Sequence, residues 1–179
     1  MLDINFKPDC ASCSALCCVA PAFDVEQGFA YNKEAHIPCV NLQEDFRCGV
    51  HKELASCGFS GCVIYDCYGA GQWVTQKLFP NINWRDSPQQ AEKIFSAFYS
   101  VKVLRELMLL LTTALQHITD PGQTQLLKSK LFEIEGLCFL TNKLTAATDL
   151  SSVTLQTMEL LQSLQATSAI ARLKSRQNS

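Results

Sequence analysis

The stretch "CASCSALCC", residues Cys10–Cys18, places four thiols within nine residues near the beginning of the sequence. Cys10 and Cys13 have the two-residue separation of chelating pairs in zinc and iron–sulfur sites, and Cys17 lies close enough to join them. Because Cys17 and Cys18 are adjacent, we expect their side chains to diverge, so that one completes this site and the other faces or bridges a second. The stretch therefore predicts a bound metal or metal–sulfur cluster.

The remaining cysteines extend this pattern. Nine of the ten lie in the first 67 residues, and Cys138 alone lies beyond them. Eight thiolates suffice for two four-sulfur sites or for one multinuclear cluster with spare thiols. Zinc and iron, including an iron–sulfur cluster, both accept four thiolates, so the ligands leave the metal open. The expected metal ligands are Cys10, Cys13, Cys17, Cys18, Cys39, Cys48, Cys62 and Cys67.

The cysteine-rich segment offers only short elements. "GVHKELASCGF" predicts a short helix from about Val50 that Gly58 ends, "CVIYDCY" is strand-prone, and "GAGQ" (69–72) predicts a tight turn that leads into a helix over "GQWVTQKLF". Such pieces are too short to form a good apolar core alone, and a core of this size rarely supplies more than about 3–5 kcal/mol. A structural zinc contributes about 10–16 kcal/mol to the folding of small peptides, against about 2–4 kcal/mol for each disulfide.

The expected compartment decides between metal and disulfides. The start "MLDINFKPDC" lacks a basic segment followed by an apolar run, so we read no secretory signal and expect a cytoplasmic protein. Cytosolic thiols stay reduced, which favours metal ligation.

A family resemblance rests on three segments: "CASCSALCC" (10–18), "PCVNLQEDFRCGVH" (38–51) and "GFSGCVIYDC" (58–67). Together they resemble the bacterial CxxCxxCC-type cysteine-cluster family, described as zinc- or iron-chelating domains and also found ahead of pentapeptide repeats, with a similar "YDCYGAGQ" ending. The resemblance covers about residues 10–76 and implies the same eight cysteines as ligands. Two features depart from it: three residues separate Cys13 from Cys17 where the signature has two, and helices follow in place of pentapeptide repeats.

Other residues near the cysteines have different expected roles. We expect Cys57 to be a free thiol, and His36 and His51 to be packing or surface residues rather than ligands or donors to ligands. Tyr65, Tyr68 and Trp73 are candidates for shielding the metal from water, with ordinary packing as the simpler role.

No catalytic residue can be assigned, and the sequence favours a protein that is not an enzyme. A thioredoxin-type role for the Cys10–Cys13 pair would require a preceding strand and would leave six further cysteines unexplained. Flagellin lysine methylases are described as sharing a related cysteine cluster, which keeps iron-dependent chemistry open by analogy.

The second half reads as helices. The segment from Ser87 to Ile118 has apolar residues at three- and four-residue steps, with Ser87 as the expected N-cap and Gln90 as part of a capping box. Asp120 and Pro121 predict the start of a helix over about 122–141. A third helix is expected over roughly 150–175, and its expected buried residues are Leu150, Val153, Met158, Leu161, Leu164 and Ile170.

These elements predict a mainly α protein. A small, irregular, cysteine-rich metal-bound module (residues 1–80) precedes an antiparallel three-helix bundle or helical hairpin (87–175) and a flexible tail (176–179). The net charge of −2 gives no general drive toward nucleic acid or membrane, and the apolar run 107–115 is too short to span a bilayer.

Three functions remain open. The first is a structural, sensing or interaction module that binds metal and contacts a protein partner or a second copy through its helices. The second is an iron–sulfur redox enzyme, and the third is a thiol–disulfide scaffold.

Overall fold

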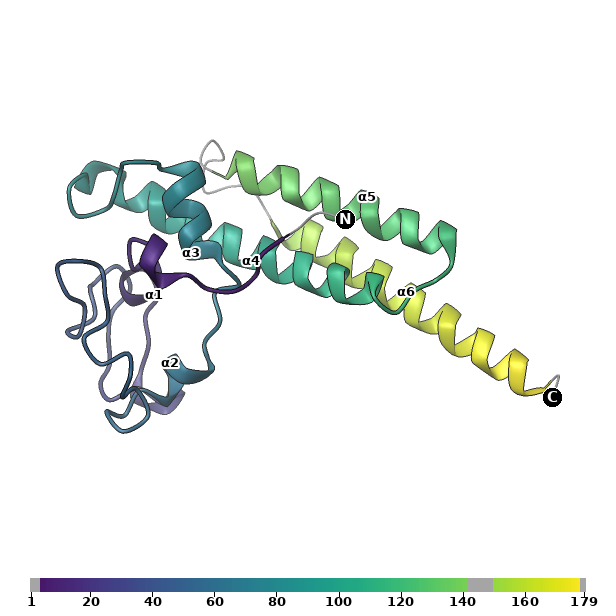
Figure 1. Ribbon diagram of the computed structural model, residues 1–179, viewed down its shortest axis with the longest axis horizontal. Coiled ribbons are helices and arrows are strands. Elements are labelled where there is room, and N and C mark those ends of the chain that lie inside the picture. Colours follow the sequence, from purple (N-terminus) through teal and green to yellow (C-terminus); the bar gives the residue numbers. More distant parts are fainter. Residues whose placement is uncertain (1–3, 142–149, 178–179) are drawn as a thin grey trace.

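The computed structural model describes residues 4–141 and 150–177, and side chains up to residue 164. Within these ranges the protein is mainly helical and contains no strand, only isolated antiparallel bridges between Phe23 and Lys33 and between Leu42 and Cys48. The predicted helical class is therefore confirmed. Figure 1 shows long helices on one side of the molecule and short helices with irregular loops on the other.

The three predicted long helices are present. A 3-10 turn, η4 (Pro88–Gln90), leads into α4 (Ala91–Leu115), which is followed by α5 (Pro121–Leu140) and α6 (Leu150–Gln177). The carboxylate of Asp120 accepts a hydrogen bond of 2.8 Å from the Gln123 amide, so the predicted start of α5 is confirmed. The capping box predicted for α4 is wrong, because neither Ser87 nor Gln90 makes a side-chain capping bond.

The long helices share an apolar core, which we call core 2. Thr157 of α6 is fully buried, whereas Met158, predicted to be buried, is 39% exposed. Thr157 tolerates burial because its hydroxyl donates to the Val153 carbonyl at 2.7 Å. The predicted burial of Ile170 lies outside the described side chains. Core 2 contains Leu104, Leu107, Met108, Leu111, Leu127, Leu131, Ile134, Cys138 and Leu164.

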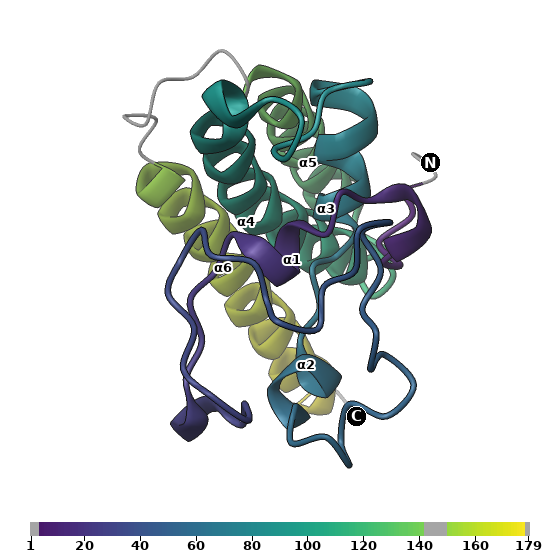
Figure 2. The ribbon, with the colours of Figure 1, turned by 90° about the vertical axis from the view of Figure 1, so that its left-hand side faces the viewer.

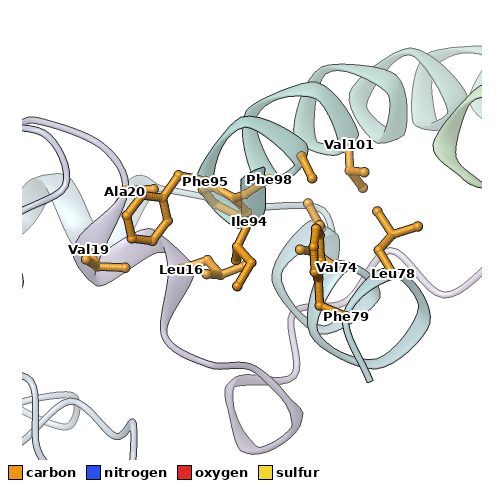
Figure 3. Packing of buried hydrophobic residues seen from close by; sticks show 12 residues of the cluster. Leu16, Val19, Ala20, Val74, Leu78, Phe79, Ile94, Phe95, Phe98 and Val101 are labelled. Atoms are coloured by element: carbon orange, nitrogen blue, oxygen red, sulfur yellow. The ribbon is translucent and has the colours of Figure 1, made fainter. Parts of the chain in front are cut away.

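A second cluster, core 1, joins the cysteine-rich segment to α4. The short helices α1 (Leu16–Val19) and α3 (Ala70–Trp73) and the π-helical turn η3 (Val74–Leu78) pack against the first half of α4 (Figure 3). The sequence indicated that these pieces are too short for a core of their own, and they do bury their apolar residues by using α4. Core 1 contains Leu16, Val19, Ala20, Ala70, Val74, Leu78, Phe79, Ile94, Phe95, Ala97, Phe98 and Val101.

Trp73 and Arg105 connect the two cores. Trp73 contacts both clusters, and its ring lies edge-on to Phe139 with the centroids 4.9 Å apart. Arg105 is buried in α4 and donates to the backbone carbonyls of Tyr68 and Asn5. The helices therefore hold the N-terminal segment and the start of α3 in place.

Residues 21–66 form what we call the loop layer, which Figure 2 shows as irregular chain around the small helix α2. It contains η2 (Val25–Gln27) and α2 (Ser60–Ile64). The predicted helix over 50–58 is wrong, because the backbone there makes a series of turns and Gly58 has a φ of 81°. The strand-prone 62–68 region begins within α2 instead, since no described strand lies beside it to pair with.

The loop layer buries little apolar surface. Phe23 and Phe59 are its buried hydrophobic residues, and they join a small aromatic group in which the rings of Phe23 and Phe29 stack with centroids 4.2 Å apart. Most of its other side chains are partly or fully exposed. Hydrophobic burial alone gives this layer weak support.

Candidate metal centre

Cys17 and Cys18 lie on α1 at the centre of the cysteine-rich segment. Leu16 and Val19 of the same helix point into core 1, and successive helical residues project about 100° apart, so the two cysteines leave the helix in different directions. Cys17 contacts core 1. The two Sγ atoms are nevertheless only 3.9 Å apart, so they meet at one point without approaching the S–S bond length of about 2.05 Å.

Cys10 and Cys13 are placed by hydrogen bonds to α3 and η3. The Asp9 carboxylate caps the 3-10 turn η1 (Cys10–Ser12), and the Asp9 amide donates to Gln72 Oε1 at 3.0 Å. After the turn, the Ser14 amide donates to Thr75 Oγ1, also at 3.0 Å. The first two thiols of the sequence are therefore fixed against a helix that begins sixty residues later.

Cys67 lies in the turn that precedes α3, and it packs against core 1 together with Cys13 and Cys17. Its carbonyl accepts from the Ala70 amide at 2.8 Å, in a turn where Gly69 has the left-handed φ of 75°. The predicted tight turn at "GAGQ" is thus confirmed. Gly71 allows close approach, because a Cβ there would lie 2.5 Å from Cys13 Sγ. We call Cys10, Cys13, Cys17 and Cys67 the inner group; all but Cys10 contact core 1.

The loop layer brings three further cysteines toward Cys18. The Cys39 amide donates to the Cys18 carbonyl at 2.9 Å. The Leu42–Cys48 bridge and a 3.0 Å bond from the Leu42 amide to the Cys39 carbonyl return Cys48 toward Cys39. Cys62 lies on α2, which is tied to the layer by the 2.9 Å bond from the Gly61 amide to the Gly28 carbonyl. We call Cys18, Cys39, Cys48 and Cys62 the outer group.

Burial and neighbouring sulfur groups raise the pKa of Cys10, Cys13 and Cys17 of the inner group. Burial raises the pKa of Cys13 to about 11, and the charge of Cys67 adds to the rise. The pKa of Cys10 is raised by burial and then by the charges of Cys67 and Cys18. The pKa of Cys17 lies well above its ordinary value because its thiol donates to Cys18, because it is buried, and because of the charges of Cys18, Cys13 and Cys67. These sulfurs are therefore close enough for their charges to interact.

The outer thiols interact in the same way. Burial raises the pKa of Cys62 to about 11, with the charges of Cys18, Cys39 and Cys48 adding to it. Burial also raises the pKa of Cys48, as do the charges of Cys18, Cys39 and Cys10. Cys18 thus interacts with Cys48 and Cys62 of the outer group. The outer group also interacts with the inner group, through the charge of Cys10 on Cys48 and through the Cys17–Cys18 contact.

Cys18 differs from the others because its pKa is lowered. The hydrogen bond from the Cys17 thiol is the main cause, and the Lys33 ammonium acts in the same direction against the effect of burial. Lys33 is 5% exposed, and its Nζ donates to the carbonyls of Val19, Glu34 and Ile37 at 3.1, 3.0 and 2.8 Å. With its hydrogen bonds satisfied, this buried ammonium provides a positive charge beside the thiols.

Tyr31 donates from its hydroxyl to Cys39 Sγ at 3.3 Å and accepts from the Val40 amide at 3.0 Å. Neither Lys33 nor Tyr31 was predicted from the sequence, because each depends on the antiparallel contact of residues 23 and 33. Among the predicted shielding residues, Tyr65 lies near the inner group, since burial and then the charges of Cys17 and Cys67 raise its pKa. The Tyr68 ring lies near Lys102 Nζ, and the Trp73 ring lies near the Arg105 guanidinium.

Several sulfur and imidazole groups stand apart from this arrangement. Cys138 is buried in core 2, and Cys57 lies in the turns before α2. His36 Nδ1 lies 3.1 Å from Glu92 Oε1 and its ring packs on Phe95, so it has partners other than sulfur. The side chain of His51 is exposed.

All ten cysteines are free thiols. Among residues 4–141 and 150–177, no three His, Cys, Asp or Glu side chains converge into a ready-made ligand set. The donors nevertheless suit a soft metal in kind and in number. Each Sγ turns about a single torsion, χ1, so its position depends on the rotamer.

No helix within residues 4–141 and 150–177 combines the length and the apolar character needed to cross a bilayer.

Comparisons with known proteins give one curated relative. The chain is 36% identical over 140 residues to "Uncharacterized protein YybG" of Bacillus subtilis (strain 168). The match covers 78% of this chain and 50% of the relative, so the chain spans about half the length of the relative it matches. No family model matches the chain. No solved structure matches it.

Proposed function

We propose that this protein binds a soft metal, zinc or iron including an iron–sulfur cluster, through its eight clustered cysteines. The observation that carries the proposal is the selectivity of the clustering. The predicted ligands gather around α1, where the Cys17 and Cys18 sulfurs lie 3.9 Å apart, Cys13 and Cys67 pack with Cys17 against core 1, and the loop layer brings Cys39 to Cys18. The charges of neighbouring thiols act on Cys10, Cys48 and Cys62 as well. Cys138 is buried in core 2 instead, and Cys57 lies in the turns before α2. A set of eight thiols that excludes two others is more typical of ligands than of ordinary burial.

The energetics of the loop layer support the same proposal. Core 1 and core 2 stabilise the helices, but residues 21–66 bury Phe23 and Phe59 as their hydrophobic residues. Cysteine ligation contributes about 10–16 kcal/mol in zinc-binding peptides, much more than two buried aromatic side chains at about 1.5–3 kcal/mol each. Ligation through Cys39, Cys48 and Cys62 would therefore dominate the stability of this layer.

The proposal includes the finer architecture. We take residues 1–80 as a metal-bound module of the CxxCxxCC-type cysteine-cluster family and residues 87–175 as a three-helix bundle. The bundle supports the module, because α4 contributes to both cores. A closed four-cysteine zinc site would stabilise the fold, and an iron–sulfur cluster would add electron transfer. We take the role as structural, sensing or interaction, with an iron–sulfur redox enzyme as the alternative.

The helices are the proposed contact surface. Leu126, Phe132 and Leu155 on α5 and α6 are 56%, 73% and 60% exposed, and such side chains suit contact with a protein partner or a second copy. Light scattering of the purified protein separates the two cases, because a dimer doubles the mass of 19.9 kDa.

Anaerobic purification tests the metal. We expect either a coloured protein with iron and acid-labile sulfide or a colourless protein with zinc, and Ellman titration should show fewer reactive thiols until a chelator is added. Protein that carries neither metal, and takes up neither on reconstitution, would contradict the proposal. Pairwise-oxidised cysteines in freshly purified protein would favour the disulfide scaffold instead.

A further inference from the structure

We propose that the cysteines form two separate four-sulfur metal sites, one made by the inner group and one by the outer group. This inference rests on the proposed function and goes beyond it by assigning each thiol to an ion. The sequence already indicates that one of the adjacent residues Cys17 and Cys18 faces a second site, and it leaves open which one. The fold assigns Cys18 to the second site and brings Cys67, the last cysteine of the segment, to the first.

Packing separates the two groups. Cys13, Cys17 and Cys67 contact core 1, whereas no member of the outer group does. The inner thiols are carried by segments bonded to α3 and η3, through Asp9 with Gln72 and Ser14 with Thr75. Of the outer thiols, Cys39, Cys48 and Cys62 are carried by the loop layer, which meets α1 through the bond from the Cys39 amide to the Cys18 carbonyl. Apart from Cys18, which lies on α1, the two groups therefore belong to different layers of the molecule.

The adjacent cysteines of α1 explain why Cys17 belongs to the inner group and Cys18 to the outer group. Cys17 and Cys18 point to different sides of one short helix, so a single helix supplies one ligand to each layer. Cys17 interacts first with Cys18 and then with the charges of Cys13 and Cys67. Cys18 interacts with Cys48 and Cys62 of the outer group and also with Cys10. The 3.9 Å between their sulfurs makes the two sites neighbours.

Each group also has its own buried cation. Lys33 Nζ donates to the carbonyl of Val19, the residue after Cys18, and Arg105 donates to the carbonyl of Tyr68, the residue after Cys67. Four thiolates around a divalent ion carry a net charge of −2, which is costly to bury without a positive neighbour. Lys33 lies in the loop layer, which carries most of the outer thiols, and Arg105 lies on α4, against which the inner thiols pack. Each cation therefore lies on the side of the group that it accompanies.

The test removes two thiols at a time, so that every variant has lost the same number. Cys13→Ser/Cys67→Ser and Cys39→Ser/Cys62→Ser each remove two ligands from one group. Cys13→Ser/Cys62→Ser and Cys67→Ser/Cys39→Ser remove one ligand from each. The full-length chain is reconstituted with Zn²⁺ alone, native mass spectrometry counts the ions, circular dichroism reports the helices, and Cys57→Ser is the control.

We expect two ions in the wild type and in Cys57→Ser, one ion in both within-group variants, and none in both cross-group variants. A within-group variant that loses both ions, or a cross-group variant that keeps one, would overturn the division. A wild type that holds a single ion would also overturn it while leaving the proposed function intact. A wild type that holds no zinc, and no iron when purified anaerobically, would instead overturn the proposed function.

Discussion

Adding one methyl group at Gly71 tests the contact between α3 and the inner group. Alanine normally stabilises a helix interior by about 1 kcal/mol relative to glycine. At Gly71, however, the new Cβ would lie 2.5 Å from Cys13 Sγ, well inside ordinary contact distance. Overpacking of this kind costs about 1–3 kcal/mol, so the net effect ranges from no gain to a loss of about 2 kcal/mol.

Gly136 provides a matched control in the same chain. It lies on α5, and a Cβ there would meet nothing within 4 Å. We therefore expect Gly136→Ala to raise the free energy of unfolding by about 1 kcal/mol. This raises the midpoint of thermal unfolding by about 2–4 °C in a chain of this size.

Calorimetry and metal analysis of the two variants form the assay. Gly71→Ala should unfold at or below the temperature of the parent and lose zinc from the inner group, because Cys13 is displaced. Gly136→Ala should unfold higher and keep its metal. If both variants gain equally and both keep full metal content, Cys13 does not lie against α3 as described.

Three further predictions concern the helices, the buried lysine and pH. Asp120→Ala should lower the free energy of unfolding, measured with urea, by about 1 kcal/mol because it removes the N-terminal cap of α5. The metal content should stay unchanged. Lys33→Met should lower the free energy of unfolding by about 1–3 kcal/mol, because it leaves the buried Val19 carbonyl unpaired. Lys128→Met, on an exposed side chain, should change that free energy by less than about 0.5 kcal/mol. Equal effects of the two substitutions would refute the role of Lys33. Burial raises the pKa of Cys13 and Cys62 from 9.0 to about 11. Without metal, these protonated thiols therefore stabilise the fold below about pH 9, and this stability should be lost as the pH rises through 11. Zinc affinity should instead strengthen with rising pH, because binding releases these protons, and a competition titration that shows no pH dependence would contradict this.

The helical half was predictable because its signals are local. Apolar residues such as Phe98 and Leu131 recur at helical spacing, and Asp120 precedes Pro121 where a helix begins. The predicted burial of Met158 was wrong because the face of α6 that is buried depends on the helices packed against it. Thr157 is buried in its place, and its hydroxyl donates to an acceptor within the helix.

The arrangement of the site depends on long-range contacts that no spacing reveals. Cys67 reaches the inner group through the turn before α3, and Cys39 reaches Cys18 through a backbone bond across twenty-one positions. Lys33 resembles any surface lysine in the sequence, and its burial follows from the bridge to Phe23. The eight cysteines stay a prediction made from the sequence, and the sequence does not show that Cys13, Cys17 and Cys67 pack against core 1.

X-ray absorption at the metal edge of the anaerobically purified protein tests the central claim most directly. We predict a first shell of four sulfur atoms, at about 2.3 Å if the metal is zinc. A shell of nitrogen or oxygen atoms at about 2.0–2.2 Å would mean that the metal is held elsewhere than at the cysteines, and would contradict the account.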